Sequence, residues 1–259
     1  MPAAVFDQFA HDYDEHFGGI LGRMYRRAVW RWLDAAFQPG EMVLELSCGT
    51  GEDALHLAER GVQILGTDPS AGMLEVARKK ILAENATDRI QLRRLAIEQI
   101  PALHGEFAGK FSGAFSNFGG LNFVADVPAA SRALAELVRP GGRVVLCIVG
   151  RYVPWEWGWF LARLHPFKAF RRLEPGGATW RGVKVYYPSI RRARRAFRKD
   201  FRLVRTGALG VLLPPPYAEL WARNKSRLIS ALDRWERRVE SWPLIPWFGD
   251  HYLLELVRR

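Results

Sequence analysis

Short apolar runs alternate with longer amphipathic segments over the middle of the chain. The apolar runs have the length of β-strands and lie at 42–46, 62–67, 90–95, 111–116 and 144–149. Three segments between them repeat apolar residues with the helical period, at 52–60, 71–84 and 127–138. Strands that alternate with helices at short intervals predict a doubly wound parallel sheet with right-handed crossovers.

Helical patterns also precede this region. Residues 5–20 predict a short helix that carries Phe6, Phe9, Ala10 and Tyr13 on one face. Residues 21–37 predict a second helix, which ends at the Gln-Pro-Gly sequence 38–40.

The pattern changes after residue 150, where tryptophan and arginine become frequent. The elements expected there are one or two short helices from Trp155 to Arg172, a loop at 174–177, an extended segment at 183–187, a helix at 190–199 capped by Ser189, a strand at 201–206, a long helix at 217–240 and a last strand at 251–257. The long helix is expected to bury one face, made of Trp221, Leu228, Leu232, Trp235 and Val239.

The first strand runs directly into a glycine turn and then into a helix. Residues 43–53 read Val-Leu-Glu-Leu-Ser-Cys-Gly-Thr-Gly-Glu-Asp, and the helical pattern is clear from Ala54 onward. Gly49 and Gly51 allow the backbone to turn tightly and a ligand to lie against it. Strand, turn and helix together predict the opening of a nucleotide-binding βαβ unit.

Two ligand classes compete for this turn. The spacing of Gly49, Gly51 and Ala54 fits the dinucleotide fingerprint, and Asp68 lies where a ribose-binding acid is expected. A dinucleotide such as NAD, however, places its pyrophosphate at the N-terminus of the helix.

Three acidic residues surround that position. Glu52 and Asp53 occupy the first helical turn, where carboxylates themselves suit the helix dipole, and Glu45 ends the strand. They would repel a pyrophosphate and tolerate a ligand that is cationic at this end, such as a sulfonium with an α-amino group. The residues therefore favour S-adenosylmethionine (SAM) over NAD.

At these residues the sequence resembles the class I SAM-dependent methyltransferases. Their first motif, acid-x-Gly-x-Gly-x-Gly, stands here at 45–51, with Ser47 in place of the first glycine. Their second motif, an acid that ends strand two, is matched by Asp68 within Gly-Thr-Asp-Pro-Ser-Ala-Gly-Met-Leu, 66–74. The resemblance covers about residues 40–150. In its wider features the sequence is similar to the ubiquinone- and menaquinone-biosynthesis-type small-molecule methyltransferases.

The resemblance implies a set of cofactor-binding residues. Glu45 would meet the amino end of SAM, and Asp68 would accept hydrogen bonds from both ribose hydroxyls. Ala96 stands where the family often has an aspartate, so the adenine amino group would meet the backbone or Glu98. The full expected set is Glu45, Ser47, Cys48, Gly49, Gly51, Asp68, Pro69, Met73, Ala96, Ile97, Glu98 and Asn117.

The catalytic residues are less clear from the sequence, because in-line methyl transfer depends largely on geometry and needs a base only for some nucleophiles. The candidates are His11, Tyr13, Asn117 and His165. If the first helix folds over the cofactor, as the resemblance implies, Tyr13 lines the site. The alternative is that this helix only packs against the rest of the domain. Asn117 follows strand four at the ligand-binding edge, where it positions a substrate or simply forms a turn. The histidines have no metal-ligand spacing, and no metal is expected.

Charge divides the chain into two parts. Residues 1–150 carry 15 basic and 18 acidic side chains, whereas residues 151–259 carry 23 basic and 9 acidic ones and eight of the ten tryptophans. Three interpretations stay open for the second part: a membrane- or lipid-contacting surface, an RNA-binding surface, and a solvated basic face over a tryptophan-containing core.

Targeting features are not evident in the sequence. The N-terminus is acidic without an apolar core, and no apolar run has the length of a membrane span. Cys48 and Cys147 do not make a disulfide framework and suit a reducing compartment. A cytoplasmic protein, with peripheral membrane contact as one option, is expected; its oligomeric state is open.

We therefore expect one α/β domain, 1–259, with a Rossmann-like seven-stranded sheet whose last strand is antiparallel and lies between strands five and six, as in the resembling fold. A helical cover would form from 1–40, a SAM-binding core from 41–150, a basic Trp-rich lid inserted after strand five at 151–200, and the last strands with the long helix at 201–259. The expected activity is methyl transfer from SAM to a small apolar or amphiphilic, lipid- or quinone-like acceptor. The alternatives are an RNA methyltransferase and a SAM-binding protein without turnover.

Overall fold

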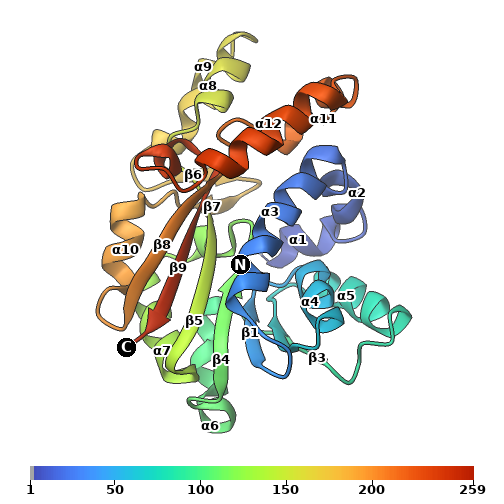
Figure 1. The fold of residues 1–259 in the computed structure, drawn as a ribbon, viewed down its shortest axis with the longest axis vertical. Helices are drawn as coiled ribbons and strands as arrows, with labels where there is room; N and C mark the ends of the chain where they lie inside the picture. Colours follow the sequence, from blue (N-terminus) through green and yellow to red (C-terminus); the bar gives the residue numbers. More distant parts are fainter. Residues whose placement is uncertain (1–2) are drawn as a thin grey trace.

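The computed structural model describes residues 3–259, and a seven-stranded mixed sheet forms the centre of that range in the order β3-β2-β1-β4-β5-β9-β8 (Figure 1). The strands of this sheet are β1 (Met42–Leu46), β2 (Gln63–Thr67), β3 (Ile90–Arg93), β4 (Phe111–Ser116), β5 (Val138–Val149), β8 (Phe201–Leu209) and β9 (His251–Arg258). A separate hairpin consists of β6 (Ala178–Trp180) and β7 (Val183–Val185).

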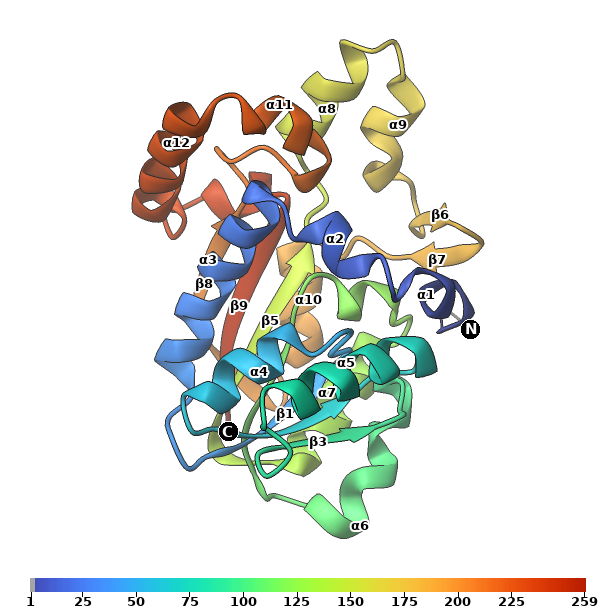
Figure 2. The same ribbon diagram turned by 90° about the vertical axis from the view of Figure 1, so that its right-hand side faces the viewer.

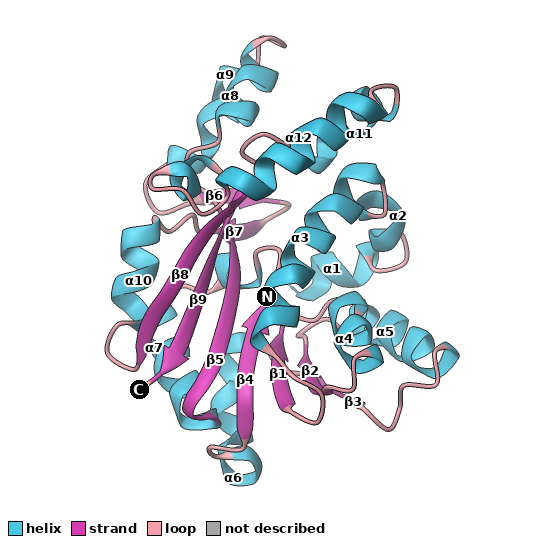
Figure 3. Ribbon diagram, in the orientation of Figure 1, coloured by secondary structure: helices cyan, strands magenta, loops and turns pink. Residues whose placement is uncertain are grey.

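Helices cover both faces of the sheet and its carboxyl edge (Figures 2 and 3). The α-helices are α1 (Ala3–Phe9), α2 (Tyr13–Phe17), α3 (Ile20–Ala36), α4 (Glu52–Glu59), α5 (Ala71–Ala83), α6 (His104–Phe107), α7 (Val127–Leu137), α8 (Pro154–Leu161), α9 (Pro166–Phe170), α10 (Ile190–Phe197), α11 (Glu219–Arg223) and α12 (Ser226–Val239). The 3₁₀ helices are η1 (Ile97–Leu103), η2 (Gly120–Phe123), η3 (Arg171–Leu173), η4 (Pro216–Ala218) and η5 (Ile245–Phe248). None of the helices in the described part of the chain combines the length and apolar character that crossing a membrane requires.

The strand pairing confirms the predicted doubly wound sheet. β1 pairs in parallel with β2 and β4, and β4 pairs in parallel with β5. β9 is antiparallel to both β5 and β8, so the last strand lies where it was predicted. Two apolar clusters sandwich the sheet: one joins it to α3 and α4, and the other joins it to η1, α7 and α10. Burial on both faces explains the apolar run at 144–149 of β5 and the apolar residues of β1, which only Glu45 interrupts.

Several predicted boundaries are wrong. The strand predicted at 144–149 begins earlier, because residues 139–143 form a bulge within β5. The partners change there from Phe111 with Val138 to Gly113 with Arg143, and Gly141 has φ +78°. The extended segment predicted at 183–187 is confirmed, because β7 begins at Val183 and pairs with β6.

The long helix expected at 217–240 is also wrong, because it is broken into η4, α11 and α12 at Asn224 and Lys225. Its predicted buried face is correct only in part, since Trp221 and Leu232 pack against the core. Leu228 and Trp235 are exposed, while Ile229 and Glu236 are buried. A buried glutamate runs against the apolar periodicity on which that prediction depended.

Candidate active site

A cavity of about 440 Å³ lies at the carboxyl edge of the parallel strands, where ligands bind in doubly wound folds. We call it the glycine-turn cavity. Nine of the expected cofactor-binding residues and the candidate Tyr13 line it: Tyr13, Ser47, Gly49, Asp68, Pro69, Met73, Ala96, Ile97, Glu98 and Asn117. Phe6, Gln99, Phe118, Gly120, Phe123 and Val124 complete the lining and were not predicted.

The turn after β1 has the backbone conformation that its glycines suggested. Gly49 and Gly51 have φ +54° and +80°, and Ser47 adopts φ +56° although it is not a glycine. A serine at the first position of the motif therefore follows a left-handed path that glycine would take more easily. Gly120 of η2 must lie close by, since a Cβ there would come within 2.8 Å of the Ser47 Cβ.

Asp68 is held rigidly at the end of β2. Its Oδ2 accepts a hydrogen bond from the Gly49 N–H (3.0 Å), and its Oδ1 accepts one from the Ser70 N–H (2.9 Å). Burial raises the pKa of this carboxyl above its usual value, and the two N–H donors only partly offset that effect. Each oxygen still has acceptor capacity, which suits two ribose hydroxyls.

Three of the expected residues lie behind the cavity wall and do not line it. Gly51 packs on Ala77, and the Cys48 sulfur lies against Gly66 of β2. Glu45 is only 2% exposed, its pKa is raised by burial, and within residues 3–259 its Oε2 has no hydrogen-bond partner. A buried acceptor without a donor fits a ligand that brings one, such as an α-amino group.

Asp53 is a site residue that the sequence analysis did not identify. Its Oδ1 accepts hydrogen bonds from Arg26 (2.8 Å) and Trp30 (2.7 Å) of α3, and its Oδ2 accepts one from the Asn117 amide (2.9 Å). The carboxylate thus fixes the orientation of Asn117. Arg26 also offsets part of the negative charge on which the argument against pyrophosphate depended.

The N-terminal segment is fastened across the cavity at two points. Asp7 of α1 accepts hydrogen bonds from the Ser70 hydroxyl (2.6 Å) and the Gly72 N–H (2.8 Å). Asp14 of α2 accepts one from the Thr50 hydroxyl (2.7 Å) and pairs with Lys80. The helix predicted at 5–20 is split in two between these points, which allows both carboxylates to reach their partners.

The position of Asp14 also indicates which class of ligand the site can bind. Asp14 places its own carboxylate next to the turn before α4, where a dinucleotide would place its pyrophosphate. The N–H groups of Gly49 and Gly51 are already bonded, to Asp68 and to the Cys48 carbonyl. Few donors are therefore left for a phosphate, whereas the site still suits a cationic ligand.

A second, smaller cavity of about 100 Å³ adjoins the first and shares Tyr13 and Phe118 with it. We call it the inner cavity. Its other lining residues are Phe17, Gly22, Tyr25, Arg26, Pro216 and His251. Burial raises the pKa of Tyr13 to about 12, so its phenol stays protonated near neutral pH. Aromatic walls and one imidazole make this cavity suitable for a small, flat, apolar group.

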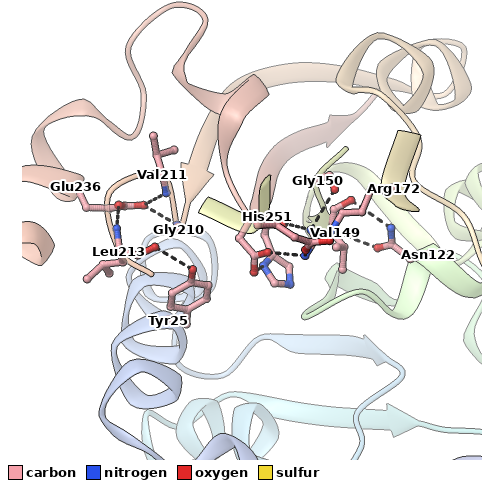
Figure 4. Close-up of polar contacts among 12 residues, drawn as sticks. Tyr25, Asn122, Val149, Gly150, Arg172, Gly210, Val211, Leu213, Glu236 and His251 are labelled. Atoms are coloured by element: carbon pink, nitrogen blue, oxygen red, sulfur yellow. Dashed lines mark hydrogen bonds and ion pairs between the residues drawn. The ribbon is translucent and has the colours of Figure 1, made fainter. Parts of the chain in front are cut away.

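His251 begins β9 and belongs to a buried chain of charged groups (Figure 4). Its Nδ1 lies 3.0 Å from Asp250, whose other oxygen is 2.7 Å from Arg172. Arg172 in turn lies 2.6 Å from Glu156 of α8. Burial alone would raise the pKa of Asp250, but Arg172 and His251 outweigh it and hold that pKa below its usual range. An ionised aspartate therefore lies beside the imidazole, and no sequence motif pointed to either residue.

The other histidine candidates lie outside both cavities. His11 and His165 are exposed, the first between α1 and α2 and the second before α9. Of the four catalytic candidates, the structure brings only Tyr13 and Asn117 together at the glycine-turn cavity.

Glu236 supports the wall behind the inner cavity. Its carboxylate accepts hydrogen bonds from four successive backbone N–H groups, those of 210–213, at 2.6–3.0 Å (Figure 4). Leu213 of this loop accepts a hydrogen bond from the Tyr25 hydroxyl (3.3 Å). The buried charge on α12 is therefore stabilised by the loop that it holds in place.

Replacing Glu236 by glutamine is expected to destabilise the fold by about 2 kcal/mol, because the new amide N–H₂ would face two buried backbone donors. For a chain of this size that corresponds to a Tm about 4–8 °C lower, measurable by calorimetry or circular dichroism. Glu84→Gln, at an exposed position after α5, is the matched control and should change Tm by no more than about 1–2 °C. An unchanged Tm in Glu236→Gln would contradict this account.

Comparison with known proteins agrees with the geometry. Residues 43–142 match the family model of a methyltransferase domain. The chain is 32% identical over 149 residues to the demethylmenaquinone methyltransferase of Corynebacterium kroppenstedtii, a match that covers 56% of this chain and 58% of the relative. It is 29% identical over 149 residues to the 2-phytyl-1,4-naphtoquinone methyltransferase of Trichormus variabilis, covering 55% and 62%. The chain thus spans less than two thirds of these relatives' length.

Solved structures show the same fold at low identity. A geranyl diphosphate C-methyltransferase of Streptomyces coelicolor A3(2) has a TM-score of 0.62 at 16% identity, covering 96% of this chain and 81% of that one. An S-adenosylmethionine-dependent methyltransferase of Mesorhizobium loti has a TM-score of 0.58 at 19% identity, covering 89% and 97%. At such identities the likeness establishes the fold.

Proposed function

We propose that this chain is a class I SAM-dependent methyltransferase and that it transfers the methyl group of SAM to a small, apolar or amphiphilic, quinone-like acceptor. Its class I fold and the methyltransferase-domain match over residues 43–142 support this proposal. The relatives that methylate quinone precursors support this acceptor class. We also propose that 1–40 and 151–200 act as the cover and the lid of a single domain.

One observation carries the proposal: the glycine-turn cavity, with Asp68 and Asn117 in its wall, lies next to an aromatic inner cavity with which it shares the lining residues Tyr13 and Phe118. A cofactor seated on the turn would direct its reactive end toward Asn117 and the inner cavity, where an acceptor ring fits. Bound SAM supplies an electrophilic methyl group on a sulfonium. Tyr13 and Phe118 would hold the acceptor in line with it and exclude water.

His251 is our candidate for the proton acceptor. When an acceptor O–H or C–H is methylated, a proton must leave as the new bond to the methyl carbon forms. The imidazole lines the inner cavity, and its Nδ1 lies 3.0 Å from the Asp250 carboxylate. The released proton would pass to His251 and then to solvent as the product leaves.

Calorimetric titration of the full chain with SAM, S-adenosylhomocysteine and NADH tests the cofactor class. Micromolar binding of the two adenosyl ligands without NADH binding is the expected result. Methyl transfer from radiolabelled SAM into a quinone-containing lipid extract would then test the acceptor class. Binding of NADH alone, or transfer to RNA but not to lipid, would overturn the proposal.

We further propose that the lid tip makes peripheral contact with the cytoplasmic membrane surface. The turn between α8 and α9 projects from the end of the molecule (Figure 2). Leu164 in this turn and Phe167 at the start of α9 are 88% and 92% exposed, and Arg163 and Lys168 flank them. Exposed apolar side chains beside cations suit an anionic bilayer surface that holds an apolar acceptor.

Replacing Leu164 and Phe167 together by aspartate is expected to weaken binding to phosphatidylglycerol-containing vesicles about tenfold or more, because two apolar contacts are lost and negative charge is added. Vesicle sedimentation measures the effect. Leu82→Asp, at a 65% exposed position on α5, is the control and should leave vesicle binding unchanged. Equal losses in both variants would show that net charge alone is responsible.

A further inference from the structure

A further cavity lies outside the candidate active site, between α7 and α10. It measures about 590 Å³ and is closed by the segments 174–177 and 186–188. Its sequence signal was the arginine-rich helix at 190–199, which the proposed methyl transfer does not use. We call it the basic cavity.

Cations dominate its lining. Six basic side chains line it, against the two carboxylates of Glu174 and Asp200: Arg132, Arg151, Arg191, Arg192, Arg195 and Lys199. Within residues 3–259 none of these six forms an ion pair. The Nε of Arg151 is buried there without a hydrogen-bond partner. Several cations without ion-pair partners around one hollow favour an anionic ligand there.

The walls between these cations are apolar. They include Val127 and Pro128 at the start of α7, Tyr186 and Pro188, and Ala196 of α10. A free inorganic anion would leave this surface uncovered, whereas a ligand that joins an anionic group to an apolar body would cover both. The concave shape suits a small molecule better than an extended nucleic-acid strand.

The pitch of α10 divides its cations into two sets. Ile190, Ala193 and Phe197 are buried, and α10 packs against α7. Arg192 and Arg195 line the basic cavity, but Arg194 and Arg198 of the same segment do not. All four are exposed. The helix thus offers a site-lining pair and a matched pair of equal charge outside the site.

The basic cavity and the glycine-turn cavity share one wall. Val124, at the end of η2, lines both. Asn122 of η2 bonds to Tyr186 twice, through its side chain (2.6 Å) and through the backbone (2.7 Å). A ligand in the basic cavity would therefore lie next to η2, whose other side faces the proposed cofactor.

We propose that the basic cavity binds a phosphate or diphosphate group carried on an apolar body. The guanidinium groups of Arg192 and Arg195 bind the phosphate oxygens in the two-pronged geometry that favours arginine over lysine. The aromatic and aliphatic wall takes the apolar part. This site does not depend on the proposed methyl transfer, because binding is measured without SAM and without turnover.

Titration of the full chain with decyl phosphate, inorganic pyrophosphate and decanol tests the proposal. Decyl phosphate should bind about tenfold more tightly than pyrophosphate, and decanol should bind more weakly still, because only the first fills both parts of the site. The double variant Arg192→Gln, Arg195→Gln should lose about tenfold or more in decyl phosphate affinity. Thermal melts check that this double variant, and the control variant described next, stay folded.

The double variant Arg194→Gln, Arg198→Gln removes the same charge from the same helical segment and should change the affinity by less than about twofold. An equal loss of decyl phosphate affinity in the two double variants would overturn the proposal, since the overall positive charge of the surface would then explain binding. Decanol binding as tightly as decyl phosphate, or a preference for an RNA hairpin over both, would overturn it as well.

Vesicles of phosphatidylglycerol distinguish the two sources of such a ligand. If the phosphate belongs to a membrane lipid, the cavity-lining variant should lose vesicle binding together with decyl phosphate binding. If it belongs to a free amphiphile, vesicle binding should persist while decyl phosphate binding is lost.

Discussion

Asp68→Ala is expected to lower the affinity for SAM by about 100-fold, equivalent to about 2.7 kcal/mol. Two effects combine. The variant loses the acceptor for the ribose hydroxyls, and a hydrogen bond to a charged group contributes about 1.5–3 kcal/mol. It also releases the N–H groups of Gly49 and Ser70, which Asp68 holds at 3.0 and 2.9 Å. Calorimetric titration with SAM measures the loss.

Asp68→Asn is the informative companion, because it keeps the shape and one acceptor oxygen and should show an intermediate loss. Asp88→Ala, in an exposed loop before β3, should bind SAM as the unmodified protein does. If a folded Asp68→Ala protein retained full SAM affinity, the glycine-turn cavity could not be the cofactor site.

His251→Ala is expected to reduce kcat about 10²–10⁴-fold, the usual contribution of a positioned general base. SAM affinity should stay within about threefold, because His251 lines the inner cavity and not the glycine-turn cavity. Single-turnover methyl transfer, combined with SAM titration, separates the two effects.

Chemical rescue distinguishes a base from a packing residue. Added imidazole should restore part of the activity of His251→Ala, since it can enter the space that the side chain leaves. His251→Asn, which is polar but cannot take up the proton, should stay inactive. A fall in SAM binding equal to the fall in kcat, or the absence of rescue, would assign His251 a structural role only.

Much of the fold was predictable because it depends on local pattern. The two-sided burial of residues 144–149 in β5 produced a continuous apolar run, and the capping of α10 by Ser189 followed from its position before the helix. The break at Asn224 and the buried Glu236 were not predictable in this way. Glu236 is buried because four N–H groups of a distant loop bind it, and apolar periodicity carries no record of such partners.

The same distinction applies to the residues of the candidate site. Gly49, Asp68, Ala96 and Asn117 were expected at the site, and the structure brings them together in one cavity. Asp53 was missed as a site residue because its partners, Arg26 and Asn117, lie on other elements. Asp7 and Asp14 read as ordinary surface acids until the packing of α1 and α2 brings them to Ser70 and Thr50.

The sequence by itself determined the order of strands and helices, the glycine turn and the acid after β2, because these depend on backbone preference and on spacing along the chain. Only the tertiary structure decided which distant side chains meet. It placed His251 beside Asp250 at the inner cavity and gathered the cations of α7 and α10 around one hollow. Hydrogen bonds and ion pairs between remote residues depend on three-dimensional distance, which chain order alone does not specify.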